Sequence, residues 1–187
     1  ERTLVPNLGG AVYQLRWSPD ARSILVAGYD RKGREGLYLV DVQTGGAVPI
    51  VQGSVHNPVW FPDGKSIAYR LTKNPGGQLL LVRNLETGQE KEIYRVSLPT
   101  GLAISPDGSY LAFEEHGTEG TSWKVIPTEG GRPRELCRTQ GARGGMTWTA
   151  DSRQLLFVSG GELASVSVEG GEPRKLGLGM KGLREIQ

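Results

Sequence analysis

Residues 17–20 read Trp17-Ser18-Pro19-Asp20, and a turn of the same kind returns three times along the chain. The later copies are Trp60-Phe61-Pro62-Asp63, Ile104-Ser105-Pro106-Asp107 and Trp148-Thr149-Ala150-Asp151. Successive aspartates are 43, 44 and 44 residues apart. A fixed period of this length is typical of four-stranded propeller blades. The sequence therefore predicts an all-β protein, a β-propeller with four complete four-stranded blades.

Each repeat contains the four strands that a blade needs. In the second repeat we expect strands at residues 57–60, 66–69, 78–83 and 91–95. The turn at 61–64 has proline, aspartate and glycine at the positions where a β-turn prefers them. The second strand of each repeat is continuously apolar, as expected for a strand buried on both faces. No long helix is predicted, because no stretch of ten or more residues keeps a 3.6-residue apolar period.

The repeat also predicts boundaries within a single propeller segment, 1–187. The expected units are 12–56, 57–100, 101–144 and 145–182. Residues 1–6 match the outer strand of a preceding unit, and residues 183–187 match the first strand of a following unit. These two pieces cannot complete one blade, because two strands would be missing between them. We therefore expect a segment of a larger propeller whose open blade edges favour self-association.

The three repeat tryptophans occupy equivalent positions in their units. Trp17, Trp60 and Trp148 each begin a turn motif. Because the position recurs with the blade period, we expect these side chains to pack between neighbouring blades.

At these turns the chain resembles the TolB-like, WD-repeat-like family of bacterial propellers. The hallmark of that family is a Trp-Ser-Pro-Asp-Gly turn followed by an aliphatic pair and an aromatic residue. Three of the four turns keep Pro-Asp, whereas the fourth has Ala150-Asp151 and the first has Ala21 in place of glycine. The resemblance covers essentially the whole chain and implies a binding or scaffold role. It also favours a periplasmic or other extracytoplasmic location, and no functional residue of the family falls on the motif.

Composition and charge exclude several classes of partner. The chain has 22 basic and 20 acidic residues and a net charge of +2, which is too balanced for a nucleic-acid-binding surface. The longest apolar runs are four or five residues, so no membrane insertion is predicted. Cys137 is the only cysteine, which excludes an internal disulfide.

No catalytic, cofactor or metal site is predicted. The run 177–182 fits the letters G-x-G-x-x-G, but a dinucleotide site needs that run between a strand and a helix. There is no G-x-S-x-G motif, and neither histidine lies in a nucleophile motif. Glu114, Glu115 and His116 make a poor metal cage, because adjacent side chains of a strand point to opposite faces. With two histidines in total, a lyase-like or lactonase-like metal site is also disfavoured.

The expected binding surface is the blade end that carries the second-to-third-strand hairpins and the inter-blade loops. These loops are free to vary, whereas the opposite end holds the repeated turns. The dense charge run at 30–35 is either a solvated hairpin or part of this surface. The candidate residues on it are Tyr29, Arg31, His56, Glu115, His116 and Arg143.

Two functions are therefore in competition. The first is a non-catalytic propeller that binds a protein or peptide, as in the sensor portion of a larger bacterial protein or in a periplasmic TolB-like protein. The alternative is the gating propeller of a prolyl-oligopeptidase-like serine peptidase whose catalytic domain is outside this chain. A G-x-S-x-G domain in the same gene would distinguish them.

Overall fold

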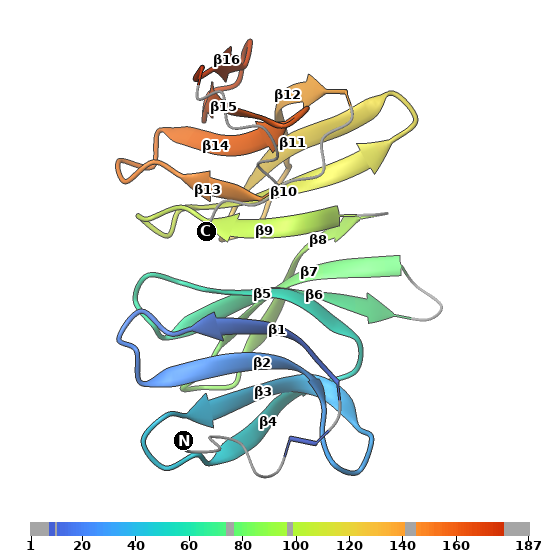
Figure 1. Cartoon of the computed structure of the whole chain (residues 1–187), viewed down its shortest axis with the longest axis vertical. Helices are drawn as coiled ribbons and strands as arrows, with labels where there is room; N and C mark the ends of the chain where they lie inside the picture. Colours follow the sequence, from blue (N-terminus) through green and yellow to red (C-terminus); the bar gives the residue numbers. More distant parts are fainter. Residues whose placement is uncertain (1–7, 10, 74–76, 97–98, 141–144, 178–187) are drawn as a thin grey trace. The chain divides into compact units, whose positions relative to one another are not determined.

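The computed structural model describes residues 8–9, 11–73, 77–96, 99–140 and 145–177. Within them the chain forms sixteen strands, no helix, and four antiparallel four-stranded sheets (Figure 1). Each sheet is a meander of strands that are consecutive in the chain. The prediction of an all-β propeller with four four-stranded blades is confirmed. No helix in the described part of the chain could span a membrane.

We number the sheets as blades 1 to 4 in chain order. Blades 1 and 2 contain β1 (Val12–Trp17), β2 (Ser23–Tyr29), β3 (Glu35–Asp41), β4 (Ala47–Gln52), β5 (Val55–Trp60), β6 (Ser66–Lys73), β7 (Gly77–Asn84) and β8 (Glu90–Val96). Blades 3 and 4 contain β9 (Pro99–Ile104), β10 (Tyr110–Gly117), β11 (Gly120–Pro127), β12 (Arg134–Thr139), β13 (Met146–Trp148), β14 (Gln154–Ser159), β15 (Glu162–Ser167) and β16 (Arg174–Lys175).

The first strands differ slightly from the expected unit starts. β5 and β9 begin two residues earlier, at Val55 and Pro99, and β13 begins one residue later, at Met146. The predicted strand pieces at 1–6 and 183–187 lie outside the described residues.

The chain divides into two compact units, Glu1–Arg95 with blades 1 and 2 and Val96–Gln187 with blades 3 and 4. In unit 1, blade 1 packs against blade 2 through one face of each sheet. Leu25 and Leu37 of blade 1 share a buried cluster with Ile67 and Tyr69 of blade 2. The second strand β2 is buried on both faces, because Leu25 packs in the cluster with blade 2 and Val26 packs in a second cluster with Tyr38 and Val40.

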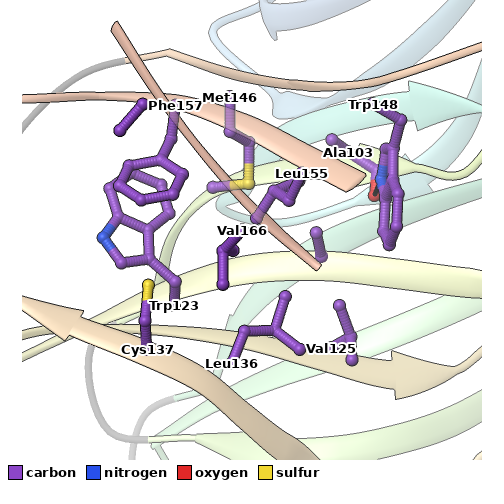
Figure 2. Packing of buried hydrophobic residues seen from close by; sticks show 12 residues of the cluster. Ala103, Trp123, Val125, Leu136, Cys137, Met146, Trp148, Leu155, Phe157 and Val166 are labelled. Carbon is purple, nitrogen blue, oxygen red and sulfur yellow. Dashed lines mark hydrogen bonds between the residues drawn. The ribbon is translucent and has the colours of Figure 1, made fainter. Parts of the chain in front are cut away.

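The core of unit 2 lies between blades 3 and 4 (Figure 2). The rings of Trp123 and Phe157 face each other there, with centroids 4.2 Å apart and planes tilted by 30°. Leu136 and Cys137 of blade 3 and Met146 of blade 4 complete the same cluster. This packing buries large aromatic surfaces from both blades, so each blade depends on its neighbour for stability.

In each unit, one repeat tryptophan donates an equivalent hydrogen bond from its indole to the neighbouring blade. The Trp60 indole donates to the carbonyl of Arg16 at 3.1 Å, and the Trp148 indole donates to the carbonyl of Ala103 at 3.0 Å. The prediction that repeat tryptophans pack between blades is confirmed for these two. It is wrong for Trp17, whose side chain is 56% exposed. Trp17 projects from the face of blade 1 that does not pack against blade 2.

Candidate binding site

The candidate site is built from the first strand and the end of the second strand of a blade. Tyr13, His56 and Thr100 each lie four residues before the tryptophan or isoleucine of their unit's turn. Tyr29 and His116 each lie nine residues after the turn aspartate. These positions are therefore repeat equivalents at the blade end opposite the Pro-Asp turns.

A β-bulge interrupts the first strand of blades 1, 2 and 3 beside these positions. The pairing register shifts between Val12 and Gln14 in blade 1 and between His56 and Val59 in blade 2. In blade 3, Phe113 pairs with Leu102 and Glu114 pairs with Thr100, so the extra residue is Gly101 of β9. A bulge changes the direction of a side chain, and bulges are frequent beside functional sites.

In unit 1 the bulges bring four side chains together, which we call the tyrosine cluster: Tyr13, Tyr29, Glu35 and His56. The Tyr13 and Tyr29 rings meet edge to face with centroids 5.8 Å apart. The Tyr13 and His56 rings are nearly parallel, at 25°, with centroids 6.4 Å apart. The Tyr13 hydroxyl donates to Glu35 Oε1 at 2.9 Å. Tyr29 and Glu35 are paired directly across the β2–β3 hairpin, so the hairpin fixes their spacing.

A backbone contact between the blades fixes the position of His56. The amide of Asn57 donates to Gln14 Oε1 at 2.5 Å, and this bond links β5 to β1. The Ser54 hydroxyl lies 3.0 Å from His56 Nε2. Both contacts flank the bulge, where Asn57 has a φ of 52°. Asparagine tolerates this left-handed conformation better than most residues.

The tyrosine cluster carries uncharged rings at neutral pH. Partial desolvation of the Tyr13 hydroxyl, followed by hydrogen bonds with Tyr29 and Glu35, raises the pKa of Tyr13 well above its ordinary value. Burial, followed by the nearby Arg70 guanidinium, lowers the pKa of His56 below 6.5. The phenol and the imidazole are therefore neutral at pH 7, and Glu35 supplies the one carboxylate of the cluster.

In unit 2 the equivalent positions form a polar group, the threonine–histidine cluster: Thr100, Glu114, His116 and Thr121. The Thr100 hydroxyl donates to Glu114 Oε1 at 2.8 Å and lies 2.6 Å from His116 Nε2. Because a hydroxyl donates a single proton, His116 Nε2 is the donor to Thr100. Thr121 Oγ1 lies 2.9 Å from the other ring nitrogen, Nδ1. Glu114 is buried beside these groups, so the cluster is held rigidly between strands.

Glu115, a predicted site residue, lies on the opposite face of β10 from this cluster. Its carboxylate pairs with Lys124 on the neighbouring strand β11. Adjacent residues of a strand point to opposite faces, which separates Glu115 from Glu114 and His116. Within the described residues, no group of three or more His, Cys, Asp or Glu side chains could hold a metal ion.

Arg31 lies in the β2–β3 hairpin, but away from the tyrosine cluster. It lines a pocket of about 350 Å³ with Leu8, Tyr38 and Pro49. The hairpin itself is organised by Asp30, whose Oδ2 accepts from Arg34 at 2.7 Å and whose Oδ1 accepts from the backbone. Arg143 and most of the glycine-rich run at 177–182 lie outside the described residues.

Comparison with known proteins places this geometry in a fold family. No protein-family model matches the chain, and no curated protein sequence matches it. Among solved structures, TolB from Acinetobacter baumannii superposes with a TM-score of 0.72 at 22% identity, over 89% of this chain and 43% of that one. The fold is that of a TolB-like β-propeller. This chain thus spans less than half the length of that TolB chain.

The TolB-like fold also matches propellers from proteins of other kinds. A structure of a nidogen/laminin complex aligns with a TM-score of 0.73 at 15% identity, over 94% of this chain and 66% of that one. A prolyl endopeptidase aligns with a TM-score of 0.64 at 14% identity, over 92% of this chain and 30% of that one. Identities this low establish the fold alone, so function has to be argued from the side chains.

Proposed function

We propose that this TolB-like chain is a non-catalytic binding propeller that holds a protein or peptide at its loop end. In unit 1 the loop end consists of the β2–β3 hairpin and the bulged starts of β1 and β5. In unit 2 the equivalent elements are the β10–β11 hairpin and the bulged start of β9. The observation that carries the proposal is the recurrence of side-chain clusters at equivalent positions: Tyr13 with Tyr29 in blade 1, and Thr100 with His116 in blade 3.

The residue types at the loop-end positions of the repeat support a role in binding a protein or peptide. The same repeat position holds tyrosine, histidine and threonine in successive units, whereas the turns at the other end keep the aspartate in all four. A scaffold needs the constant positions, and a binding surface uses the variable ones. Exposed tyrosines are typical anchors of protein interfaces.

The test is to select peptides from a random display library with the purified chain and to map their footprint by amide hydrogen exchange. We expect protection in β1, the β2–β3 hairpin and the start of β5. Tyr13→Ala should lower the affinity for a selected peptide by about tenfold or more, as for an interface anchor. Asp63→Ala, at the opposite end of blade 2, is the matched control and should change affinity little. Protection centred on the Pro-Asp turns, or a library that yields no saturable binder, would refute the proposal.

A second candidate is the gating propeller of a prolyl-oligopeptidase-like peptidase. The structural match to a prolyl endopeptidase favours it, because that match covers only 30% of the longer chain and leaves room there for another domain. The gene that encodes this chain distinguishes the two: a G-x-S-x-G segment beyond the propeller supports the peptidase. We propose that this chain alone has no peptidase activity, and a mutation-sensitive cleavage of peptide substrates would overturn that proposal.

We also propose an extracytoplasmic location for the protein, and fractionation of the native cells tests it.

A further inference from the structure

The tyrosine cluster has the composition of a cation-binding site. The face of an aromatic ring attracts a cation within about 6 Å of its centroid. Tyr13 and Tyr29 place two aromatic rings at right angles in this cluster, with centroids 5.8 Å apart. Glu35, bonded to the Tyr13 hydroxyl, places a carboxylate beside both rings.

The carboxylate of Glu35 has no cationic partner among the described residues. Of the three basic side chains of its own hairpin, Arg34 pairs with Asp30 at 2.7 Å, and Arg31 and Lys32 line the pocket. A carboxylate has about four acceptor positions, and the Tyr13 hydroxyl uses one of them. Glu35 therefore retains both charge and acceptor capacity.

A second tyrosine–glutamate pair in unit 1 has an arginine as its third member. The hydroxyl of Tyr69 donates to Glu90, and Arg83 Nη1 contacts the same Glu90 oxygen at 3.4 Å. That tyrosine–glutamate–arginine set is assembled from β6, β7 and β8, and the Tyr69 side chain is fully buried. The tyrosine cluster has the tyrosine and the glutamate, but no described residue supplies the arginine.

We infer that the tyrosine cluster binds an arginine side chain of the partner, held over the Tyr13 and Tyr29 rings with its guanidinium on Glu35. This inference rests on the proposed binding function. Arginine is favoured over lysine because its planar guanidinium both stacks on aromatic rings and forms paired hydrogen bonds with a carboxylate. Tyr13 is 42% exposed as a residue, so a ligand can reach it.

Arg70 sets the side from which the cation enters. Arg70 lies opposite His56 in the register of β5 and β6, and its charge disfavours a second cation next to the imidazole. The guanidinium therefore lies on the Tyr29 and Glu35 side of Tyr13. His56 supports the opposite side of the Tyr13 ring.

The test uses blocked pentapeptides that differ only at a central residue: arginine, lysine, or citrulline, which has the shape of arginine without its charge. Binding is followed by NMR chemical shifts of the tyrosine rings. We expect the arginine peptide to bind about tenfold more tightly than the citrulline peptide, within the range of a cation–π contact and a carboxylate bond. Glu35→Gln should remove that difference. Glu86→Gln, an exposed acid in the β7–β8 turn of the same unit, is the control and should preserve it.

Two further variants keep the result interpretable. Tyr13→Phe keeps the ring and should retain most of the arginine preference, whereas Tyr13→Leu should weaken arginine binding by about two- to thirtyfold. Equal binding of arginine and citrulline peptides by the unmodified chain would overturn the inference. A display-selected partner that binds the loop end without any basic residue would also overturn it, while leaving the proposed function intact.

Discussion

The residue that follows each turn aspartate adopts a left-handed backbone conformation in all four blades. The φ values are 68° for Gly64, 75° for Gly108, 57° for Ala21 and 61° for Ser152. Glycine takes this conformation freely, whereas an L-residue is strained by roughly 1–2 kcal/mol. The backbone is therefore strained at Ala21 and Ser152, which stand where the family has glycine.

Replacing Ala21 by glycine should relieve that strain. We expect Ala21→Gly to raise the free energy of unfolding by about 0.5–1 kcal/mol, since the larger entropy of glycine in the unfolded chain offsets part of the gain. Gly64→Ala is the matched opposite and should lower it by about 1 kcal/mol. A methyl group at Gly64 would meet only Pro19 Cδ, at 3.9 Å, so that cost is conformational. Urea unfolding measures both, and a destabilised Ala21→Gly would contradict this account.

In three of the four turns, a hydroxyl group two residues before the aspartate donates a hydrogen bond to the carboxylate and stabilises its ionised form. The hydrogen bond from Ser105 is the largest cause of the lowered pKa of Asp107, and the bond from Thr149 acts in the same way on Asp151. A lowered folded-state pKa stabilises the fold above the ordinary value of 3.8, and that stability is lost as pH falls through the lowered value. Acid should therefore weaken the fold below about pH 4.

The Ser105→Ala variant isolates this effect. Removing the hydroxyl takes away the 2.6 Å bond to Asp107 and the bond that it accepts from the Tyr110 amide. We expect the pKa of Asp107 to rise and the unfolding free energy at pH 7 to fall by about 1–2 kcal/mol. Carboxyl-carbon NMR titration of Asp107 checks the first, and urea unfolding at pH 7 and pH 3 checks the second. An unchanged titration of Asp107 would exclude the role of the hydroxyl.

At the scale of the element, the indole-to-carbonyl bond joins one blade to the next. Trp148 is buried and donates to Ala103, so Trp148→Phe keeps an aromatic side chain but leaves that carbonyl without its partner. We expect Trp148→Phe to cost about 1–3 kcal/mol of unfolding free energy. Trp60→Phe, the equivalent change in unit 1, should cost a similar amount. Thermal unfolding of both variants is the measurement, and no change in either would show that shape alone joins the blades.

The strands and turns could be predicted because the same sequence pattern occurs four times along the chain. The bulges could not, since they depend on how a first strand pairs with its neighbour. As a result, three residues of the clusters were not predicted as site residues: Tyr13, Glu35 and Thr100. The prediction did include the side chains that lie beside them, namely Tyr29, His56 and His116. The available signals were Asn57-Pro58 and Gly101, because such residues interrupt regular strand pairing. Alternation along β10 was a further signal, and it separates Glu115 from His116.

At the scale of the whole molecule, the repeat produces the same interface inside each unit, but the exposure of the tryptophans differs. The Trp60 and Trp148 indoles have carbonyl partners, whereas no described residue accepts a hydrogen bond from Trp17. Trp17 and Leu15, at 56% and 55% exposure, lie on the face of blade 1 away from blade 2. An apolar sheet face of this kind favours association when nothing covers it.

We therefore expect the isolated chain to self-associate through this face of blade 1. The Leu15→Ser, Trp17→Ser double variant should shift the protein toward monomer, because it removes the exposed apolar surface without touching the packing between blades 1 and 2. Val48→Ser is the control, since Val48 is 55% exposed but lies opposite Leu39, on the other face of the sheet. Light scattering over a hundredfold range of protein concentration, about 1 to 100 μM, spans the affinities of weak to moderate dimers. A mass that stays monomeric throughout that range, for the unmodified chain and for both variants, would show that this face is covered within one molecule.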